Sequence, residues 1–225
     1  MNTHWGKHNT RQRAGKKRKG EAVVEEVKPL DLGLEDLPIF GMNNNNNNET
    51  IFKKGNHLYF YDDVTTLNNL KFTRLLREID RQQQVQLLQG EITEPTIHIH
   101  INSPGGSLLD GFSMASSVLA CNSKTVAYAE AIVASAATLP LVCCNERHIQ
   151  KYCYVLIHQL SSGFWGTYEN FLDEQTNLDN LMEQLCDLYY EHTKVPKKKL
   201  RSILKHDLYW NADTCIKYNV VDDLC

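Results

Sequence analysis

Apolar and polar residues alternate strictly over residues 96–103, TIHIHINS. In an extended chain this pattern puts Ile97, Ile99 and Ile101 on one face and Thr96, His98 and His100 on the other. We therefore predict a β-strand here with one buried face. Shorter runs rich in β-branched and aromatic residues predict further strands over 56–64, 125–131 and 148–159.

Apolar residues recur at helical spacing between these strands. The pattern predicts one long helix over 67–89 and a second over 167–192, with shorter helices over 108–120, around residue 135 and just before 218–224. The stripe of the first helix consists of Leu67, Leu70, Leu75, Leu76, Ile79 and Leu87. The stripe of the second consists of Tyr168, Phe171, Leu172, Leu178, Leu181, Met182, Leu185, Leu188 and Tyr189. Strands that alternate with helices indicate an α/β domain with a mostly parallel sheet.

The first fifty residues have a different composition. They contain the basic run RQRAGKKRKG and end in six asparagines, Asn43–Asn48. A solvated, disordered basic arm is the more common outcome for such a run, so binding to nucleic acid is not expected. We predict a disordered tail and Asn-rich linker over 1–50 and one folded domain over 51–225.

Composition narrows the class of protein. The chain of 225 residues has a net charge of −3 and 42% hydrophobic residues, which is typical of a soluble globular protein. Its seven cysteines form no C-x-x-C motif and follow no secretory signal, so we expect reduced thiols in the cytoplasm and no zinc site. Apolar runs are too short to cross a bilayer, and no Walker sequence is present, so we expect no membrane span, no ATP hydrolysis and no cofactor.

Four features carry candidate chemistry. Ser135 lies in the apolar run AIVASAATLPLVCC, and the double glycine in SPGGS precedes a predicted helix, where N–H groups can bind an oxyanion. His158 ends a strand in VLIHQ, and Asp207 precedes an apolar pair in KHDLYW. Each has an ordinary structural alternative, namely packing, a tight turn, a core histidine or a helix cap. Together they supply the hydroxyl, base, carboxylate and N–H donors of serine acyl transfer.

The motifs INSPGG, the small residues around Ser135, LIHQ with the following glycine loop and long helix, and HDLYWNADTCIKYNVVDDL resemble the proteolytic subunit of the Clp protease. The resemblance covers residues 51–225. It implies the fold shared with crotonases, built from repeated β-β-α units with a protruding helix-strand handle. It also implies Ser135 as nucleophile, His158 as general base and then acid, and Asp207 as the orienting carboxylate. The N–H groups of Gly106 and Ala136 would form the oxyanion hole.

The resemblance further implies polypeptide substrates, a homo-oligomeric ring that encloses the active sites, and an AAA+ unfoldase as partner. The apolar surplus of the 167–192 helix favours a large oligomer. Ala131, Ile132, Ala136 and Ala137 differ from the usual family pattern, and Pro140 should disturb the first turns of the helix that follows Ser135. These departures indicate a divergent member.

Three alternatives stay open. One is a virus-encoded head-maturation protease of the same fold. Another is a crotonase-like acyl-CoA enzyme, which uses glycine N–H groups to stabilise an enolate and needs no serine. The third is a catalytically degenerate ring subunit.

Overall fold

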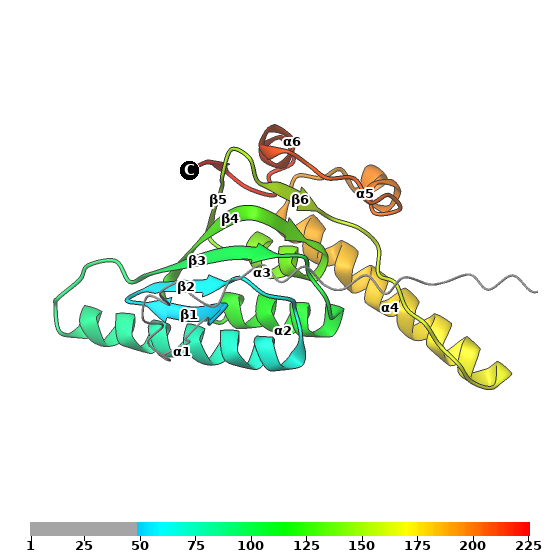
Figure 1. Ribbon diagram of the computed structural model, residues 1–225, viewed down its shortest axis with the longest axis horizontal. Coiled ribbons are helices and arrows are strands. Elements are labelled where there is room, and N and C mark those ends of the chain that lie inside the picture. Colours follow the sequence, from blue (N-terminus) through cyan, green and yellow to red (C-terminus); the bar gives the residue numbers. More distant parts are fainter. Residues whose placement is uncertain (1–48) are drawn as a thin grey trace, which may run out of the picture. The chain divides into compact units, whose positions relative to one another are not determined.

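The computed structural model describes residues 49–225. The expected tail and linker therefore lie outside the described residues, except for Glu49 and Thr50. A parallel-rich sheet makes up this part, with the first three helices against one face and the last two, short helices beyond β6 (Figure 1). None of its helices is long and apolar enough to cross a membrane.

The sheet runs in the order β1-β2-β3-β4-β5-β7. The strands are β1 Ile51–Lys54, β2 His57–Phe60, β3 Thr96–Ser103, β4 Lys124–Ala134, β5 Glu146–Ile149, β6 Tyr154–Leu156 and β7 Asp223–Leu224. Only the β1–β2 pair is antiparallel. The first half of β4 pairs with β5 and its second half with β6, so the sheet divides along β4. This division directs the end of β4 toward β6 and the segment that follows it.

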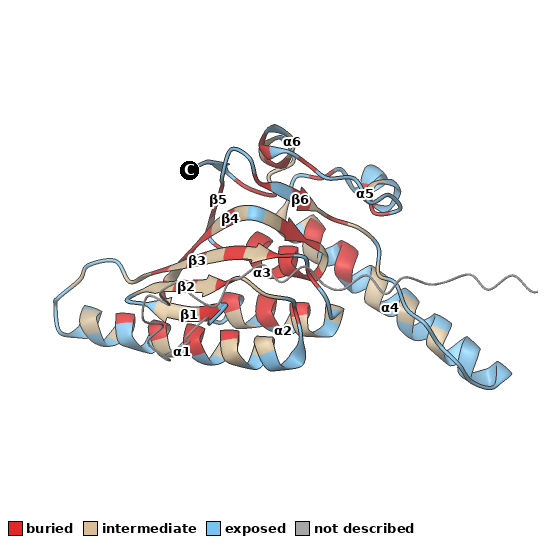
Figure 2. Ribbon diagram, viewed as in Figure 1, coloured by how far each residue is buried: buried red, intermediate tan, exposed pale blue. Residues whose placement is uncertain are grey.

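The helices are α1 Thr66–Leu88, α2 Leu108–Leu119, α3 Thr138–Val142, α4 Tyr168–His192, α5 Lys197–Ile203 and α6 Ala212–Lys217. Figure 2 shows the buried residues of α1 and α2 on their sides toward the sheet. The alternation of β3 is confirmed, because Ile97, Ile99 and Ile101 are buried and the intervening residues are not. The mixed α/β class is confirmed as well, and the strand–strand–helix order occurs at β1–β2–α1 and β5–β6–α4.

Several sequence expectations differ in detail from the structure. The single strand expected over 148–159 is two strands, because the chain turns between Gln150 and Cys153, where the Cys153 N–H donates to the Gln150 carbonyl. The helix expected just before 218–224 is confirmed as α6, whereas the pattern did not predict α5. Leu67 and Leu70 in the stripe of α1 are exposed.

The handle helix expected over 167–192 is α4, capped by Thr167, and the segment 157–167 that leads into it has no strand in this single chain. Only Leu185, Cys186 and Tyr189 of α4 are buried. These three residues lie in its last two turns, and the earlier part of α4 extends away from the sheet (Figures 1 and 2). The apolar residues near the start of α4 are therefore exposed in the single chain.

Candidate functional site

Ser135 occupies a sharp turn between a strand and a helix. β4 ends at Ala134, and Ser135 begins a 3₁₀ helix, Ser135–Ala137, that continues into α3. The φ of Ser135 is +56°, in the left-handed region that side chains other than glycine rarely adopt. A serine at such a turn presents its hydroxyl at the end of the sheet, as the nucleophilic serine does in α/β-hydrolases.

The expected effect of Pro140 is present. The residues after Ser135 form a 3₁₀ turn, and α3 is only five residues long with Pro140 as its third residue. A proline is tolerated in the first turn of a helix, because the N–H that it lacks would have no partner there. Pro140 thus fits into the first turn of α3, and Ser135 begins the 3₁₀ helix that precedes it.

The double glycine lies directly against this turn. A Cβ on Gly105, whose φ is +93°, would come within 2.5 Å of the Ala134 carbonyl oxygen and 2.6 Å of the Ser135 Cβ. A Cβ on Gly106 would come within 2.3 Å of the Val64 carbonyl oxygen. The turn is fixed to the chain at Val64, whose N–H donates to Gly105 O and whose carbonyl accepts from Ser107 N–H, both at 2.8 Å. Close approach of backbone to backbone is thus the reason for glycine at both positions.

His158 and Asp207 come from segments that the sequence does not obviously pair. His158 follows β6 by two residues, and Asp207 lies in the loop between α5 and α6. Two backbone hydrogen bonds between Val155 and Trp210, of 2.9 and 2.7 Å, fasten this loop to β6. The Asp207 loop therefore lies beside the residues that follow β6.

The structure brings Ser135, His158 and Asp207 together. His158 Nε2 is 2.8 Å from Ser135 Oγ, and His158 Nδ1 is 3.1 Å from Asp207 Oδ1. With Nδ1–H donating to the carboxylate, Nε2 is the free acceptor for the serine hydroxyl. The side chain of Asp207 is 75% exposed, and that of His158 is 25% exposed.

A pocket of about 260 Å³ opens beside these residues. Ser135, His158, Gly106 and Ala136 all line it, so the two expected N–H donors border the same space as the hydroxyl and the imidazole. Its remaining lining is Ser107, Leu108, Leu139, Gln159, Leu160, Ser161, Leu185 and Tyr189. The apolar part of this lining can accept an apolar side chain next to the hydroxyl.

The sequence reasoning missed Thr138, although this residue is a second hydroxyl in the apolar run that contains Ser135. Thr138 Oγ1 donates to the Ser135 carbonyl oxygen at 2.6 Å, and it lies 2.6 Å from the hydroxyl oxygen of Tyr189. A polar residue at a position where the helix should be buried was the available signal. The helical spacing of the sequence indicates Tyr189 only as part of the apolar stripe of its helix.

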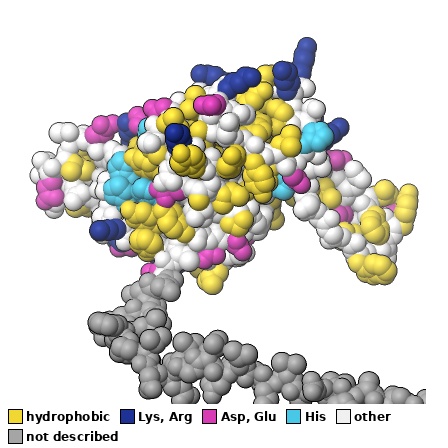
Figure 3. Space-filling model, turned by 45° about the horizontal axis from the view of Figure 1, so that its top comes forward, with side chains coloured by type: hydrophobic (Ala, Val, Ile, Leu, Met, Phe, Trp, Pro, Cys, Tyr) yellow, Lys and Arg dark blue, Asp and Glu magenta, His cyan; other side chains and the backbone are white. Residues whose placement is uncertain are grey.

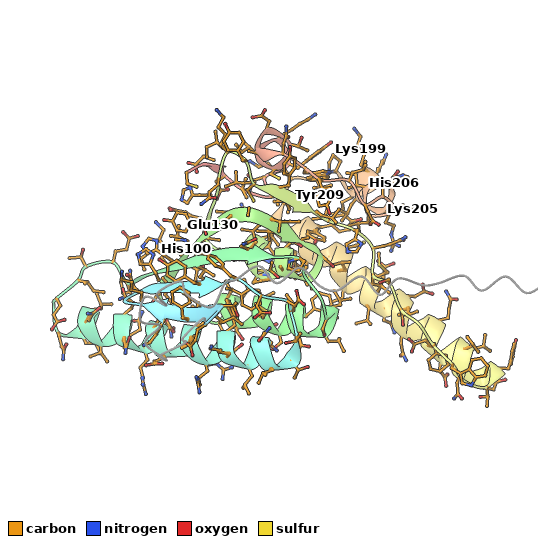
Figure 4. All side chains as sticks on the ribbon, viewed as in Figure 1. His100, Glu130, Lys199, Lys205, His206 and Tyr209 are labelled. Carbon is orange, nitrogen blue, oxygen red and sulfur yellow. The ribbon has the colours of Figure 1, made fainter. Side chains whose placement is uncertain are left out.

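A second polar cluster lies on the sheet face that α1 and α2 do not cover. His57 Nδ1 is 2.9 Å from His100 Nε2, and His100 Nδ1 is 2.9 Å from Glu130 Oε1. Tyr61 donates to Glu130, and His98 meets the hydroxyl of Tyr128 at 3.1 Å. Figure 4 shows His100 and Glu130 together over β3 and β4, and Figure 3 shows histidine side chains gathered on this face. His100 is thus a member of a hydrogen-bonded network with His57, Glu130 and Tyr61, and His98 forms a separate pair with Tyr128 beside it.

Neither this network nor any other group among residues 49–225 has the arrangement of three or more ligands that a metal ion needs. All seven cysteines are free thiols. Cys143 and Cys144 are buried, as expected for small apolar residues, and burial raises the pKa of the Cys143 thiol to about 12. Such thiols are poor nucleophiles at neutral pH.

The known proteins to which this chain is similar are proteolytic subunits of the Clp protease. A family model described as Clp protease matches residues 58–225. The ATP-dependent Clp protease proteolytic subunit of Deinococcus radiodurans is 24% identical over 143 residues, which cover 63% of this chain and 70% of that protein. The ATP-dependent Clp protease proteolytic subunit 2 of Chlamydia pneumoniae is 27% identical over 141 residues, 62% of this chain and 70% of that protein.

The ATP-dependent Clp protease proteolytic subunit of Chlamydomonas reinhardtii is 27% identical over 168 residues, which cover 74% of this chain but 31% of that longer protein. The family model spans most of the sequence and includes all of Ser135, His158 and Asp207. The chain therefore belongs to the Clp protease family of peptidases.

Proposed function

We propose that this protein is a serine endopeptidase that cleaves polypeptides with a triad of Ser135, His158 and Asp207. The observation that supports the proposal most directly is the hydrogen-bonded line from Ser135 Oγ to His158 Nε2 and from His158 Nδ1 to Asp207. A nucleophile, a base within hydrogen-bond reach and a carboxylate that orients the base are the parts that serine acyl transfer needs.

In the first step Ser135 Oγ attacks the carbonyl carbon of the scissile peptide bond while His158 Nε2 takes the hydroxyl proton. The resulting imidazolium faces the Asp207 carboxylate through Nδ1–H, which lowers the energy of the charged intermediate. His158 then gives the proton to the leaving amine, and the C–N bond breaks to leave an acyl ester on Ser135. Water, deprotonated by the same imidazole, hydrolyses this ester and restores the serine.

Backbone N–H groups of Gly106 and Ala136 are the proposed donors to the oxyanion. Both residues line the pocket that contains Ser135, and Ala136 directly follows it at the start of the 3₁₀ turn. Because these donors belong to the backbone, no side chain has to reorganise when charge develops on the oxygen. The glycine at 106 fits this role, since any side chain there would collide with Val64.

The relatives are named as proteolytic subunits of an ATP-dependent Clp protease, and we propose the same role for the present chain. We propose a homo-oligomeric ring whose chamber encloses the active sites, supplied with unfolded polypeptide by an AAA+ unfoldase. Exposed apolar residues on the first half of α4 and on the loop before it support assembly, because a single chain leaves them in water. The free thiols suit the reducing conditions of the cytoplasm.

The test is a comparison of Ser135→Ala with Ser116→Ala, whose hydroxyl bonds only the Phe112 carbonyl on the exposed side of α2. Loss of a triad nucleophile costs about a millionfold in kcat. Ser135→Ala should therefore show no peptide hydrolysis and take up no fluorophosphonate, whereas Ser116→Ala should match the wild type in both assays.

Hydrolysis that persists in Ser135→Ala would overturn the triad. A wild-type protein that neither cleaves peptides nor reacts with the fluorophosphonate would instead favour a degenerate ring subunit. Turnover of an acyl-CoA that survives Ser135→Ala would favour the crotonase-like alternative, because enolate stabilisation needs no serine.

A further inference from the structure

Two buried hydroxyls link α4 to the turn that holds Ser135. Tyr189 lies in the buried part of α4, where 1% of the residue is exposed, and Thr138 is the first residue of α3 and fully buried. Their oxygen atoms are 2.6 Å apart, and Thr138 Oγ1 is also 2.6 Å from the Ser135 carbonyl oxygen. The three groups form a chain from one helix to the peptide unit of Ser135.

The direction of the hydrogen bonds in this chain is fixed by elementary chemistry. The Ser135 carbonyl can only accept, so the single hydroxyl hydrogen of Thr138 is donated to it. The contact between the two hydroxyls is then made by the hydrogen of Tyr189, which donates to Thr138 Oγ1. Burial raises the pKa of the Tyr189 phenol, so its proton stays in place throughout the pH range in which peptidases work.

The chain acts on the peptide unit that follows a residue of unusual backbone conformation. Ser135 has a left-handed φ of +56°, a conformation that persists only where the surroundings fix it. Its carbonyl, held by Thr138, belongs to the same peptide unit as the Ala136 N–H. Rotation of this unit would turn that N–H away from its place in the pocket and so change its position relative to the serine hydroxyl.

We propose that Thr138 and Tyr189 are positioning residues that hold the Ser135–Ala136 peptide unit in the orientation needed for acyl transfer. The inference rests on the proposed function of Ser135 as nucleophile. Thr138 acts directly through its bond to the carbonyl, and Tyr189 acts through Thr138. The buried end of α4 thereby contributes to the geometry of the site without touching the reacting atoms.

An alternative is that the two hydroxyls only fill space and satisfy each other in the core. The two roles predict different behaviour in the double variant Thr138→Val with Tyr189→Phe. Thr138→Val alone leaves the Tyr189 hydroxyl buried without a partner, which destabilises the fold. Tyr189→Phe in the same chain removes that unpaired group, so stability should recover. The side-chain bond to the Ser135 carbonyl stays lost, and the Thr138 backbone N–H remains as a donor to that oxygen.

The experiment measures kcat, KM and the fluorophosphonate inactivation rate of the full chain with a short fluorogenic peptide, together with the unfolding midpoint. Thr138→Val should lower kcat about 10- to 100-fold, the range expected for a small misplacement of reacting groups, with KM changed less than about twofold. The inactivation rate should fall in parallel. The double variant should unfold at a higher temperature than Thr138→Val and yet keep its low kcat.

Three further variants separate a positioning role from a general loss of stability. Thr138→Ser keeps the hydroxyl and should retain kcat within about threefold of the wild type, whereas Tyr189→Phe should lose roughly 3- to 10-fold, about the value of one hydrogen bond. Tyr190→Phe is the matched control on the same helix, because the Tyr190 hydroxyl bonds the Lys197 carbonyl at 3.2 Å and does not line the pocket. It should leave both kcat and KM unchanged.

A kcat that returns with stability in the double variant would overturn the positioning role, as would a change confined to KM. This outcome leaves the proposed function intact if Ser135→Ala is inactive in the same assays. If Ser135→Ala is active, or the wild-type protein neither cleaves peptide nor reacts with fluorophosphonate, the proposed function and the inference fail together.

Discussion

Gly105 is the residue at which the glycine turn comes closest to the Ser135 backbone. An alanine there would place its Cβ 2.5 Å from the Ala134 carbonyl oxygen and 2.6 Å from the Ser135 Cβ, neither of which can move away cheaply. We predict that Gly105→Ala lowers kcat more than 100-fold, because a shift of about 1 Å at a reacting group can cost this much.

The matched control for this prediction is Gly90→Ala. Gly90 also has a positive φ, +75°, but no atom lies within 4 Å of its added Cβ. Both alanines carry the strain of the left-handed region, about 1–2 kcal/mol, and only the one at 105 meets the serine turn. The collision at 105 adds to the loss of unfolding free energy there, so the rates are compared under conditions in which both variants are folded. A much lower peptidase rate in Gly105→Ala than in Gly90→Ala would support the prediction. Equal rates in the two variants would contradict it.

Asp207 differs from the buried carboxylate of the best-known serine protease triads, because 75% of its side chain is exposed. Water can therefore replace part of its interaction with the His158 imidazole. We predict that Asp207→Asn lowers kcat, but by clearly less than the about 10⁴-fold found where the carboxylate is buried. Steady-state kinetics on a short peptide measures the loss. A loss as large as that of Ser135→Ala would show that the exposed carboxylate is closed off from water in the working enzyme.

At the scale of elements, the open face of β2, β3 and β4 carries stacked histidine and tyrosine rings. The ring centroids are 4.5 Å apart for His57 and His98 and 4.4 Å apart for Tyr59 and His100. Burial lowers the pKa of His57 below its ordinary value of 6.5, and the neighbouring His100 lowers it further. Burial also lowers the pKa of His98, and His57, His100, His148 and Lys124 add to this effect.

The lowered pKa values of His57 and His98 make the folded state less stable at acidic pH. As pH falls through about 6.5, the unfolded chain binds protons at these two imidazoles that the folded sheet does not yet bind. The free energy of unfolding must therefore decrease on acidification, and the penalty is absent above that pH. We predict that His98→Gln loses less thermal stability than the wild type between pH 7.5 and pH 5.5.

His206→Gln is the control for this prediction, because His206 is exposed in the loop before Asp207 (Figure 4). It should lose as much stability as the wild type over the same interval. Other titrating groups are common to all three proteins and cancel in the comparison. An acid-induced loss in His98→Gln equal to that of the wild type would show that the stacked rings do not couple folding to protonation.

The pattern of the sequence predicts elements better than it predicts contacts between them. The alternation of β3 and the helical spacing of 167–192 depend on local periodicity, which is why both were found. The pairing of Val155 with Trp210 joins distant segments through backbone groups, so no pattern of side chains in the sequence predicts it. The left-handed Ser135 and the hydroxyl of Tyr189 were missed for the same reason, since each depends on what the fold brings next to it.

At the scale of the whole molecule, the apolar surface at the start of α4 has no partner within the described residues. Phe164, Trp165, Tyr168, Phe171 and Leu172 are all exposed, and Trp165 is 95% exposed. The rings of Phe164 and Phe171 contact each other edge to face, with centroids 5.3 Å apart. Contiguous exposed aromatic groups of this kind mark surfaces that bind other proteins.

We predict that Phe171→Glu disrupts assembly of the protein into its proposed ring-shaped oligomer. A charge placed within the apolar surface at the start of α4 would have to be desolvated in the interface. No lysine or arginine occurs between 152 and 193 to pair with it from a symmetry-related α4. Sedimentation velocity should show smaller species than for the wild type.

Asn177→Glu is the control, because it introduces the same charge at an exposed polar position of the same helix. It should leave the sedimentation coefficient unchanged. Because Phe171 is remote in sequence from Tyr189 and does not line the pocket, the far-ultraviolet circular dichroism spectrum should be preserved. An oligomer of unaltered size in Phe171→Glu would mean that this surface binds something other than a second copy of the chain.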